Sequence, residues 1–435
     1  MSSDASAPLT PATVDLEVAR LDSARMDAAR LDAEGRRARP AKDGDKRFVQ
    51  PLRKSHRNLE RPPFDCIALV LQGGGALGAF QAGVYQALAE ANLHPDWVSG
   101  ISVGAINAAL IAGNAPQARL DKLRAFWEQV SAPHIPDPFG FAEPWLQGDL
   151  SRGIVNRLHA SSAMFAGTPG FFTPRFPPPY LYPPGAIEAT SWYDTKPLIG
   201  TLENLVDFDR INASPMRFSV GAVNIRSGNF VYFDSTTHKI RPEHILASGA
   251  LPPGFPPIEI DGELYWDGGL VSNTPLQWVV EGDTRQDTLA FQVDLWSARG
   301  EVPSDLPGVM VRQKEIQYSS RTRANTDNFK KIQTARNALA NIIEKVPPEF
   351  FDNEDGRLLR SVADRRVYQI VHLIYRSRKY EGQSKDYEFS RASMNDHWTA
   401  GYNDAMRTLR HPEALMRPTD RSGCGTFDVA VNGRE

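Results

Sequence analysis

The chain has 435 residues, of which 41% are hydrophobic and 23% charged, and its formal net charge is −3. These values are typical of a globular protein with a large core, and the weak net charge gives no indication of nucleic-acid binding. Only two cysteines occur, Cys66 and Cys424, which argues against a disulfide framework and indicates a reducing compartment. The nine histidines form no metal-binding motif, so we expect no metal and no cofactor.

Residues 1–60 differ in composition from the rest of the chain. They are rich in small and polar residues, which predicts a disordered tail. Basic residues from Arg36 to Arg57 favour contact with anionic lipid, although a solvated tail is the simpler interpretation because no aromatic residues lie among them. The first residues lack the basic and apolar regions of a secretory signal, and no apolar run reaches the roughly 18–20 residues of a membrane span. We therefore expect a cytoplasmic protein, with peripheral contact at the inner face of the membrane as an alternative.

Two strand–turn–helix units follow from Asp65. The apolar run CIALVLQ (66–72) predicts a strand covered on both faces, and apolar residues recur with helical spacing over 80–91. DWVSGIS (96–102) predicts a second strand, and VGAINAALIAG (103–113) a helix of small residues. This alternation predicts a three-layer α/β/α domain with a mostly parallel central sheet.

The segment from 133 to 190 interrupts this pattern. Its stretch FFTPRFPPPYLYPPG (171–185) is so rich in proline that it forms neither a helix nor an inner strand. A long irregular insert in a compact domain is often functional. We expect either a lid or substrate-facing wall made by its aromatic residues, or a packed surface loop.

The rest of the chain predicts more sheet and then a helical region. MRFSVGAVNI (216–225) and NFVYFDS (229–235) form a hairpin, and 288–296 is another core strand. Beyond these strands, 306–435 is mainly helical, with a strand-like segment at 366–375 that joins the sheet. The predicted organisation is therefore a basic tail (1–60), a catalytic domain with an insert (61–305) and a mainly helical C-terminal region (306–435).

A candidate nucleophile lies in the second of the two turns. Gly100-Ile101-Ser102-Val103-Gly104 is a G-x-S-x-G motif between a predicted strand and a predicted helix, which is the context of a nucleophile elbow. The glycines permit the strained turn, and the positive end of the helix favours developing alkoxide character on the Ser102 hydroxyl.

The first turn has three interpretations. Gly73-x-Gly75-x-x-Gly78 fits the dinucleotide fingerprint, but bare amides also suit an oxyanion, and a tight turn needs no ligand. A dinucleotide site requires an acidic residue at the tip of the second strand, whereas Asp96 precedes that strand. The neighbouring elbow therefore favours the oxyanion.

A carboxylate is the better candidate for the base. The late histidines lie in no glycine-marked loop, and His372 reads as a core residue of an apolar strand. Asp267 follows an apolar segment and precedes two glycines in LYWDGGLVSNTP (264–275). A partly desolvated carboxylate bonded to a serine hydroxyl can accept its proton, although D-G-G alone also fits a plain turn.

Four motifs in this order resemble the patatin-like phospholipases, whose Ser–Asp dyad acts without histidine. They are QGGGALGAFQAGV (72–84), GISVG (100–104), ASGALPPGFPP (247–257) and WDGGLVSNTP (266–275). The resemblance spans roughly 65–297 and implies a patatin-like fold with Ser102 as nucleophile and Asp267 as base. It also implies an oxyanion hole made by the amides around Gly73, Gly74, Gly75 and Ala76. The glycines that support these motifs are Gly78, Gly100, Gly104, Gly268 and Gly269.

The implied activity is that of a serine acyl hydrolase that cleaves lipid carboxylic esters through an acyl-enzyme, as in phospholipase A, lysophospholipase or esterase reactions. The expected partner is a lipid or acyl-ester substrate. Two alternatives remain open, namely a catalytically weak lipid-binding or scaffold protein and an intracellular polyester depolymerase with the same dyad. One departure is Leu77, where the family often carries Arg or Lys, so no cation assists the oxyanion from that position.

Overall fold

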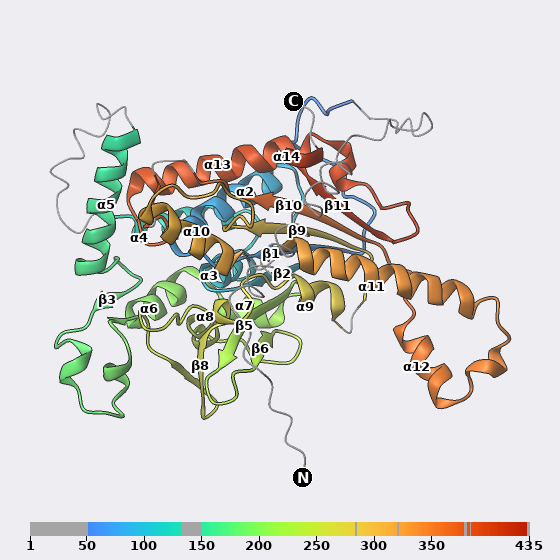
Figure 1. The fold of residues 1–435 in the computed structure, drawn as a ribbon, viewed down its shortest axis with the longest axis horizontal. Helices are drawn as coiled ribbons and strands as arrows, with labels where there is room; N and C mark the ends of the chain where they lie inside the picture. Colours follow the sequence, from blue (N-terminus) through green and yellow to red (C-terminus); the bar gives the residue numbers. More distant parts are fainter. Residues whose placement is uncertain are drawn as a thin grey trace, which may run out of the picture. The chain divides into compact units, whose positions relative to one another are not determined.

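A nine-stranded sheet organises the chain in the computed structural model, which describes residues 51–132, 149–282, 285–319, 322–377, 381–382 and 384–432 (Figure 1). In spatial order the strands are β11 (Cys424–Asp428), β10 (Tyr368–Ile374), β9 (Thr288–Asp294), β1 (Cys66–Leu71), β2 (Trp97–Gly100), β5 (Arg217–Asn224), β8 (Glu263–Asp267) and β7 (Ile258–Ile260), and β6 (Phe230–Asp234) pairs with β5. From β11 to β5 all neighbours are parallel, whereas β6, β8 and β7 are antiparallel to their partners. The expected mostly parallel sheet is thus confirmed.

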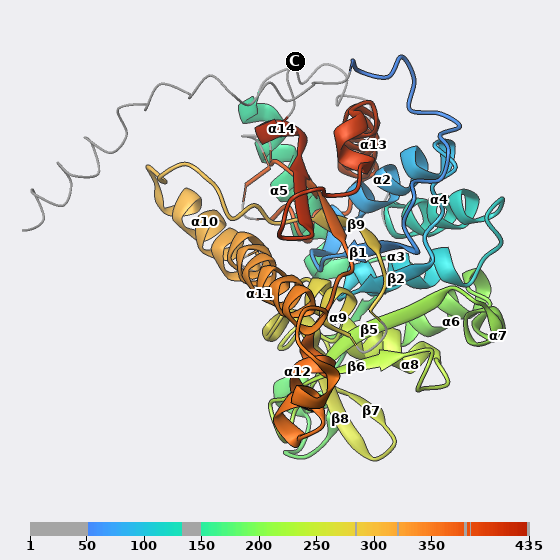
Figure 2. The same cartoon turned by 90° about the vertical axis from the view of Figure 1, so that its right-hand side faces the viewer.

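Alternate side chains of β1 face two helical layers, because successive residues of a strand point to opposite faces of the sheet. Ile67, Leu69 and Leu71 belong to the main core, whereas Ala68 and Val70 belong to a second cluster. The main core includes side chains of α2 (Ala79–Glu90), α3 (Val103–Ala112), α4 (Arg119–Val130) and α13 (Arg391–Leu409). The second cluster includes side chains of α9 (Leu276–Glu281) and α11 (Thr322–Ile343), and Figure 2 shows the two layers on opposite sides of the sheet. The three-layer α/β/α class is confirmed.

The other helices lie between and around these layers. They are α5 (Asp149–Ala166), α6 (Lys196–Leu205), α7 (Phe208–Ala213), α8 (Pro242–Ser248), α10 (Leu306–Tyr318), α12 (Glu354–Val362) and α14 (Val429–Asn432). Within the described ranges, no helix is both long enough and apolar enough to cross a bilayer.

The C-terminal region is part of the same folded unit, which runs from Pro51 to the end of the chain. Its strand β10 joins the sheet beside β9, as the sequence predicts, and β11 extends the sheet by one strand that the sequence does not predict. Helix α13 packs on α2, where a Cβ on Gly83 or Gly401 would overlap the backbone of the other helix. The helical C-terminal extension is confirmed, but it also completes the sheet.

The predicted tail is only partly described. Residues 1–50 lie outside the described residues. Residues 51–60 are attached to the folded chain, since the amide of Asn58 donates to the Glu90 carbonyl (3.0 Å) and Arg57 pairs with the Glu90 carboxylate (3.0 Å). The expectation of disorder is therefore wrong for residues 51–60.

The insert is built from α5 and a small two-stranded ribbon. The ribbon pairs β3 (Thr173–Pro174) with β4 (Tyr193–Asp194), and it lies outside the central sheet. Residues 133–148 of the insert lie outside the described residues. The stretch 171–185 is neither α-helix nor inner strand, as predicted, and its first two residues, Phe171 and Phe172, are buried.

Candidate active site

The two glycine-containing turns meet at one edge of the sheet because β1 and β2 are parallel neighbours. Leu71 and Gly100 are paired in register, and the amide of Ile101 donates to the Leu71 carbonyl (3.0 Å). Ser102 has φ 55° and ψ −125°, a backbone conformation that is strained for a residue with a side chain. A Cβ on Gly104 would overlap the Leu71 carbonyl oxygen, so only glycine lets the elbow approach β1 this closely.

Asp267 ends β8, and its carboxylate reaches Ser102. It pairs in register with Ala222 of β5, the strand next to β2. Asp267 is 2% exposed, its carboxylate accepts a 2.7 Å hydrogen bond from the Gly269 amide, and it lies close enough to the Ser102 hydroxyl for that group to lower its pKa. Burial raises the pKa of Asp267 from 3.8 to about 7, while the Gly269 amide and the Ser102 hydroxyl act to lower the pKa. This carboxyl can therefore exchange a proton with the serine near neutral pH.

The four amides expected in the oxyanion hole are not equivalent. The Ala76 amide donates to the Asp386 carbonyl (2.8 Å), and the Gly73 amide makes a longer bond to the Asn273 carbonyl (3.3 Å). The amides of Gly74 and Gly75 donate to no atom within the described part of the chain. Gly74 and Gly75 therefore offer the available donors, and Ala76 does not.

A network of buried amide side chains holds the glycine loop from behind. Asn273 Nδ2 donates to the Gly73 carbonyl (3.0 Å), and Trp296 Nε1 donates to the same oxygen (3.0 Å). Gln72 Oε1 accepts from the amides of Leu295 (2.6 Å) and Trp296 (2.9 Å). Gln72, Asn273 and Trp296 were not among the predicted site residues. A glutamine at the end of an apolar strand does, however, indicate a buried side chain that makes hydrogen bonds.

Ser102 and Asp267 line a cavity of about 410 Å³, within the usual size range of ligand sites. Its wall is mainly apolar and includes several aromatic rings, of which those of Phe172 and Tyr193 have centroids 4.9 Å apart. The aromatic lining residues are Phe171, Phe172, Tyr193, Phe255, Trp296, Tyr318, Tyr387 and Phe389. The insert thus contributes Phe171, Phe172 and Tyr193 to the cavity wall, and its role as a substrate-facing wall stays a prediction. Tyr318, Tyr387 and Phe389 come from the C-terminal region, where the sequence showed no site.

Leu77 does not face this cavity. Its side chain is fully buried in the main core, and it is not among the residues that line the cavity. Leu77, at the position where a cation could have assisted the oxyanion, thus packs in the core. The amide donors of the glycine loop do not depend on its side chain.

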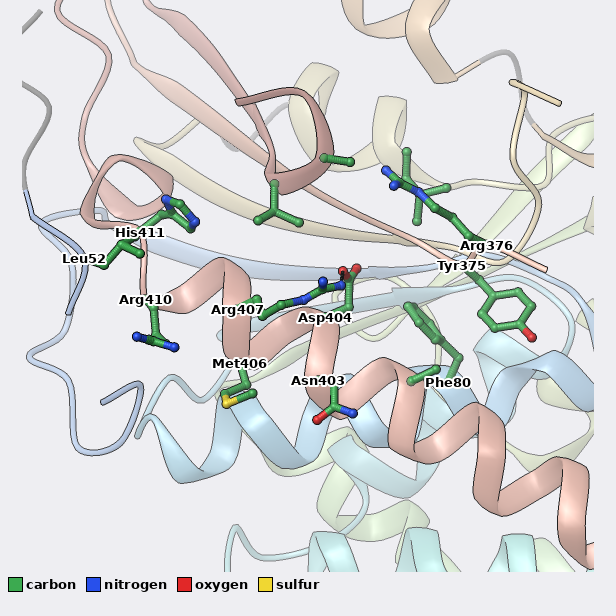
Figure 3. A pocket seen from close by; sticks show the side chains of 14 residues that line it. Leu52, Phe80, Tyr375, Arg376, Asn403, Asp404, Met406, Arg407, Arg410 and His411 are labelled. Atoms are coloured by element: carbon green, nitrogen blue, oxygen red, sulfur yellow. Dashed lines mark hydrogen bonds and ion pairs between the residues drawn. The ribbon is translucent and has the colours of Figure 1, made fainter. Parts of the chain in front are cut away.

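A larger cavity, of about 720 Å³, lies between α13 and the ends of β10 and α14 (Figure 3). Its charged side chains pair with one another or with neighbours. Arg407 bonds to Asp404 (3.1 Å), and Arg376 lies 3.7 Å from Asp428. None of its lining residues, all of them described, is a serine, threonine or cysteine. The larger cavity therefore has no nucleophile for acyl transfer.

The histidines that the structure describes give no alternative base. No histidine is among the residues that line the catalytic cavity. His372 lies in β10 between Gln292 and Asp428 of the adjacent strands, and burial lowers its pKa to about 4. Within the described residues, no group of three or more His, Cys, Asp or Glu residues is arranged to hold a metal ion.

Comparison with family models gives two matches. A model described as patatin-like phospholipase matches residues 69–279, a range that includes Ser102 and Asp267. A second model, described as patatin phospholipase, matches residues 316–421, which include Tyr318 and Phe389 of the cavity wall.

Curated relatives match up to about half of the chain. Mouse patatin-like phospholipase domain-containing protein 7 is 27% identical over 213 residues, which is 48% of this chain and 12% of the mouse protein. Lysophospholipase nte1 of Aspergillus terreus is 47% identical over 60 residues, covering 14% of this chain and 4% of the relative. The matches thus span a small part of each relative. Among solved structures, VipD from Legionella pneumophila matches with 16% identity and a TM-score of 0.33, covering 87% of this chain and 77% of VipD.

Proposed function

The chain belongs to the patatin-like phospholipase family, and from this premise we propose that it is a serine acyl hydrolase that cleaves lipid carboxylic esters through a Ser102–Asp267 dyad. The observation that carries the proposal is the buried Asp267 carboxyl beside the Ser102 hydroxyl in one cavity, together with two amides of the glycine loop that donate to no described atom. A serine, a base of matched pKa and oxyanion donors are the parts that acyl transfer requires.

Acylation begins when Asp267 accepts the hydroxyl proton of Ser102 as its Oγ attacks the ester carbonyl carbon. A pKa near 7 suits this task, because such a carboxylate is available at neutral pH and is still basic enough to take the proton. The amides of Gly74 and Gly75 donate to the oxyanion, and one such donor is typically worth about 3–4 kcal/mol. The alcohol then leaves with the proton held by Asp267, and an acyl-serine ester remains.

Deacylation repeats these steps with water. Asp267 takes a proton from a water molecule that attacks the acyl-serine carbonyl, and the same amides hold the second oxyanion. The bond to Ser102 Oγ breaks, Oγ regains the proton from Asp267, and a carboxylic acid is released. This chemistry uses only side chains and backbone of the described residues.

The aromatic wall supports an acyl chain as the group bound next to Ser102. Phe171, Phe172 and Phe389 present apolar surface to the cavity, and their rings lie within 5.3–6.3 Å of one another. Such a wall suits the acyl part of a phospholipid or a lysophospholipid. We keep the location proposed from the sequence, cytoplasmic with peripheral contact at the membrane.

The test combines active-site labelling with matched substitutions. A fluorophosphonate probe should label the wild type but not Ser102→Ala. Both Ser102→Ala and Asp267→Asn should lower hydrolysis of p-nitrophenyl butyrate by about a thousandfold or more. Ser162→Ala and Asp261→Asn, which change exposed residues outside the cavity, should keep wild-type activity. Undiminished hydrolysis by Ser102→Ala would reject the dyad, whereas a wild type that is neither labelled nor active would support a lipid-binding scaffold.

A further inference from the structure

The insert exposes several large apolar side chains to solvent. We call this set the insert surface. Its members, with their exposed fractions, are Met164 (51%), Phe165 (86%), Phe176 (94%), Tyr180 (73%), Leu181 (66%) and Trp192 (50%). Contiguous apolar patches on a protein surface usually mark a binding function, because their exposure to water is unfavourable.

These residues belong to one structured unit. The Tyr193 hydroxyl donates to the Met164 carbonyl (2.9 Å), which ties the ribbon to the end of α5. The Arg175 amide donates to the Trp192 carbonyl (3.0 Å), so Trp192 is bonded to the residue that precedes Phe176 at the end of the ribbon. In Figure 1, α5 and β3 lie at the left of the molecule, away from β10 and β11 at the upper right. Met164, Phe176 and Trp192 are therefore held near one another by the ribbon and its bond to α5.

The insert surface borders the catalytic cavity. Met164 is half exposed and also lines the cavity, one residue before the exposed Phe165. The Trp192 amide donates to the Pro253 carbonyl (3.0 Å), and Pro253 is an exposed residue of the cavity lining. A path from solvent to Ser102 at this rim is therefore flanked by members of the insert surface.

The chemistry of the insert surface suits a lipid bilayer. Tyr and Trp combine an apolar ring with a polar group and are enriched at membrane interfaces, while Phe and Leu enter the acyl region. Between 153 and 196 the sequence has three cationic residues (Arg157, Arg175 and Lys196) and two acidic ones (Glu188 and Asp194). The Asp194 carboxylate accepts a bond from the Lys196 amide (3.0 Å) within its own turn. The charge near the surface thus does not oppose an anionic membrane.

We propose that the insert surface docks the protein on a phospholipid bilayer, so that an acyl chain passes from the bilayer directly into the cavity beside Ser102. Cleavage of the bound lipid at Ser102 rests on the proposed hydrolase function. Docking of the insert surface on the bilayer does not depend on that function. A bilayer is favoured over a protein partner because the apolar surface continues into a cavity whose wall is apolar as well.

The test uses the full chain and vesicles of phosphatidylcholine with a minor share of phosphatidylglycerol. Phe165→Asp/Leu181→Asp places two charges on the insert surface at exposed positions, where folding is not affected. Flotation should show that this variant partitions about tenfold or more weakly than the wild type. Its hydrolysis of vesicle lipid should fall in parallel, while hydrolysis of soluble p-nitrophenyl butyrate stays within about twofold of the wild type.

Matched controls and a second substitution make the result decisive. Val302→Asp and Phe350→Asp add the same charge at apolar positions that are 93% and 65% exposed and lie outside the insert, so both should float like the wild type. Tyr180→Asp, on a different part of the insert, should also weaken flotation. If the double variant binds vesicles as the wild type does, or if the controls lose binding equally, the proposal is wrong.

The same experiment separates this proposal from the hydrolase assignment. A wild type that floats through the insert surface but hydrolyses neither vesicle lipid nor soluble ester would contradict the proposed function and support the docking surface. Binding that persists in the double variant and disappears only at high salt would assign docking to basic residues such as those of the N-terminal tail, and would overturn the docking proposal.

Discussion

The Ala76 amide donates a 2.8 Å hydrogen bond to the backbone carbonyl of Asp386, so a segment of the C-terminal region is fastened to the glycine loop. The Asp386 carboxylate is itself held by Lys314 Nζ, 2.9 Å from both oxygens. The segment then continues into Tyr387 and Phe389, which line the cavity. The site therefore depends on residues more than a hundred positions beyond Asp267.

Gly75 should be the least replaceable residue of the glycine loop. It has φ +56°, and a Cβ there would overlap the Asp386 carbonyl oxygen. Gly75→Ala should displace the loop and lower kcat/KM for p-nitrophenyl butyrate by about a hundredfold or more, as expected when an oxyanion donor is lost. Gly200→Ala is the control, because Gly200 lies in α6 with nothing within 4 Å of its Cβ position. The control should be fully active, and equal activity of the two variants would contradict the loop assignment.

The ion pair between Lys314 and Asp386 should help to position the glycine loop. Both side chains are partly exposed, so the loss in stability of Lys314→Met should be modest, about 1 kcal/mol or less. We expect a fall in kcat on the order of three- to tenfold, because the backbone of Asp386 becomes less firmly held. Arg226→Gln, which removes an exposed pair with Glu263 at 3.6 Å, should change neither kcat nor stability. A Lys314→Met enzyme with wild-type kcat would show that the pair does not support the site.

Activity should depend on pH through Asp267. The base acts in its ionised form, and burial raises its pKa to about 7. The value of kcat/KM for a soluble ester should therefore rise about tenfold per pH unit below 7 and level off above it. Thermal unfolding recorded at each pH separates this titration from loss of structure. A rate that stays constant down to pH 5 would mean that the base ionises well below neutrality.

Asp267→Asn should stabilise the protein above neutral pH. Because the pKa of Asp267 is higher in the folded state than the unfolded value of 3.8, the folded state binds the extra proton between about pH 4 and pH 7. The wild type therefore loses stability as the pH rises through this window. We compare the free energy of unfolding of Asp267→Asn with that of the wild type at each pH. This difference should be roughly 1–4 kcal/mol more favourable to Asp267→Asn at pH 8 than at pH 4.

Denaturant titrations of both proteins at these two pH values measure this change. Asp261→Asn is the control, since the Asp261 side chain is 77% exposed and should show no comparable pH dependence. A difference between Asp267→Asn and the wild type that is the same at pH 4 and pH 8 would contradict a raised pKa.

The cavity wall should set the acyl chain length that is accepted. Ala163 of α5 is 8% exposed and lines the cavity. Ala163→Phe should shorten the space and reduce hydrolysis of palmitoyl esters about tenfold relative to butyryl esters. Ser162→Phe adds the same ring at the adjacent, exposed position outside the lining and should leave the ratio unchanged. An unaltered ratio in Ala163→Phe would place the acyl chain elsewhere.

The sequence points to Ser102, Asp267 and the glycine loop as candidates because each rests on a local signal. Ser102 lies in a short motif whose strand–turn–helix context can be read along the chain, and Asp267 ends a strand just before two glycines. The sequence could not show that the Ala76 amide is already hydrogen-bonded. Its partner is the carbonyl of Asp386, and a backbone acceptor that far away leaves no pattern in the sequence.

The sequence alone determined the class of the fold, the candidate nucleophile and base, and the glycine loop, because strand periodicity and turn chemistry act between residues close together in the chain. Only the tertiary structure decided which loop amides are free, that Leu77 is a core residue, that β11 extends the sheet, and that the C-terminal region completes the cavity wall. These features arise from contacts between distant segments, whose pairing depends on how the whole core packs rather than on any local stretch.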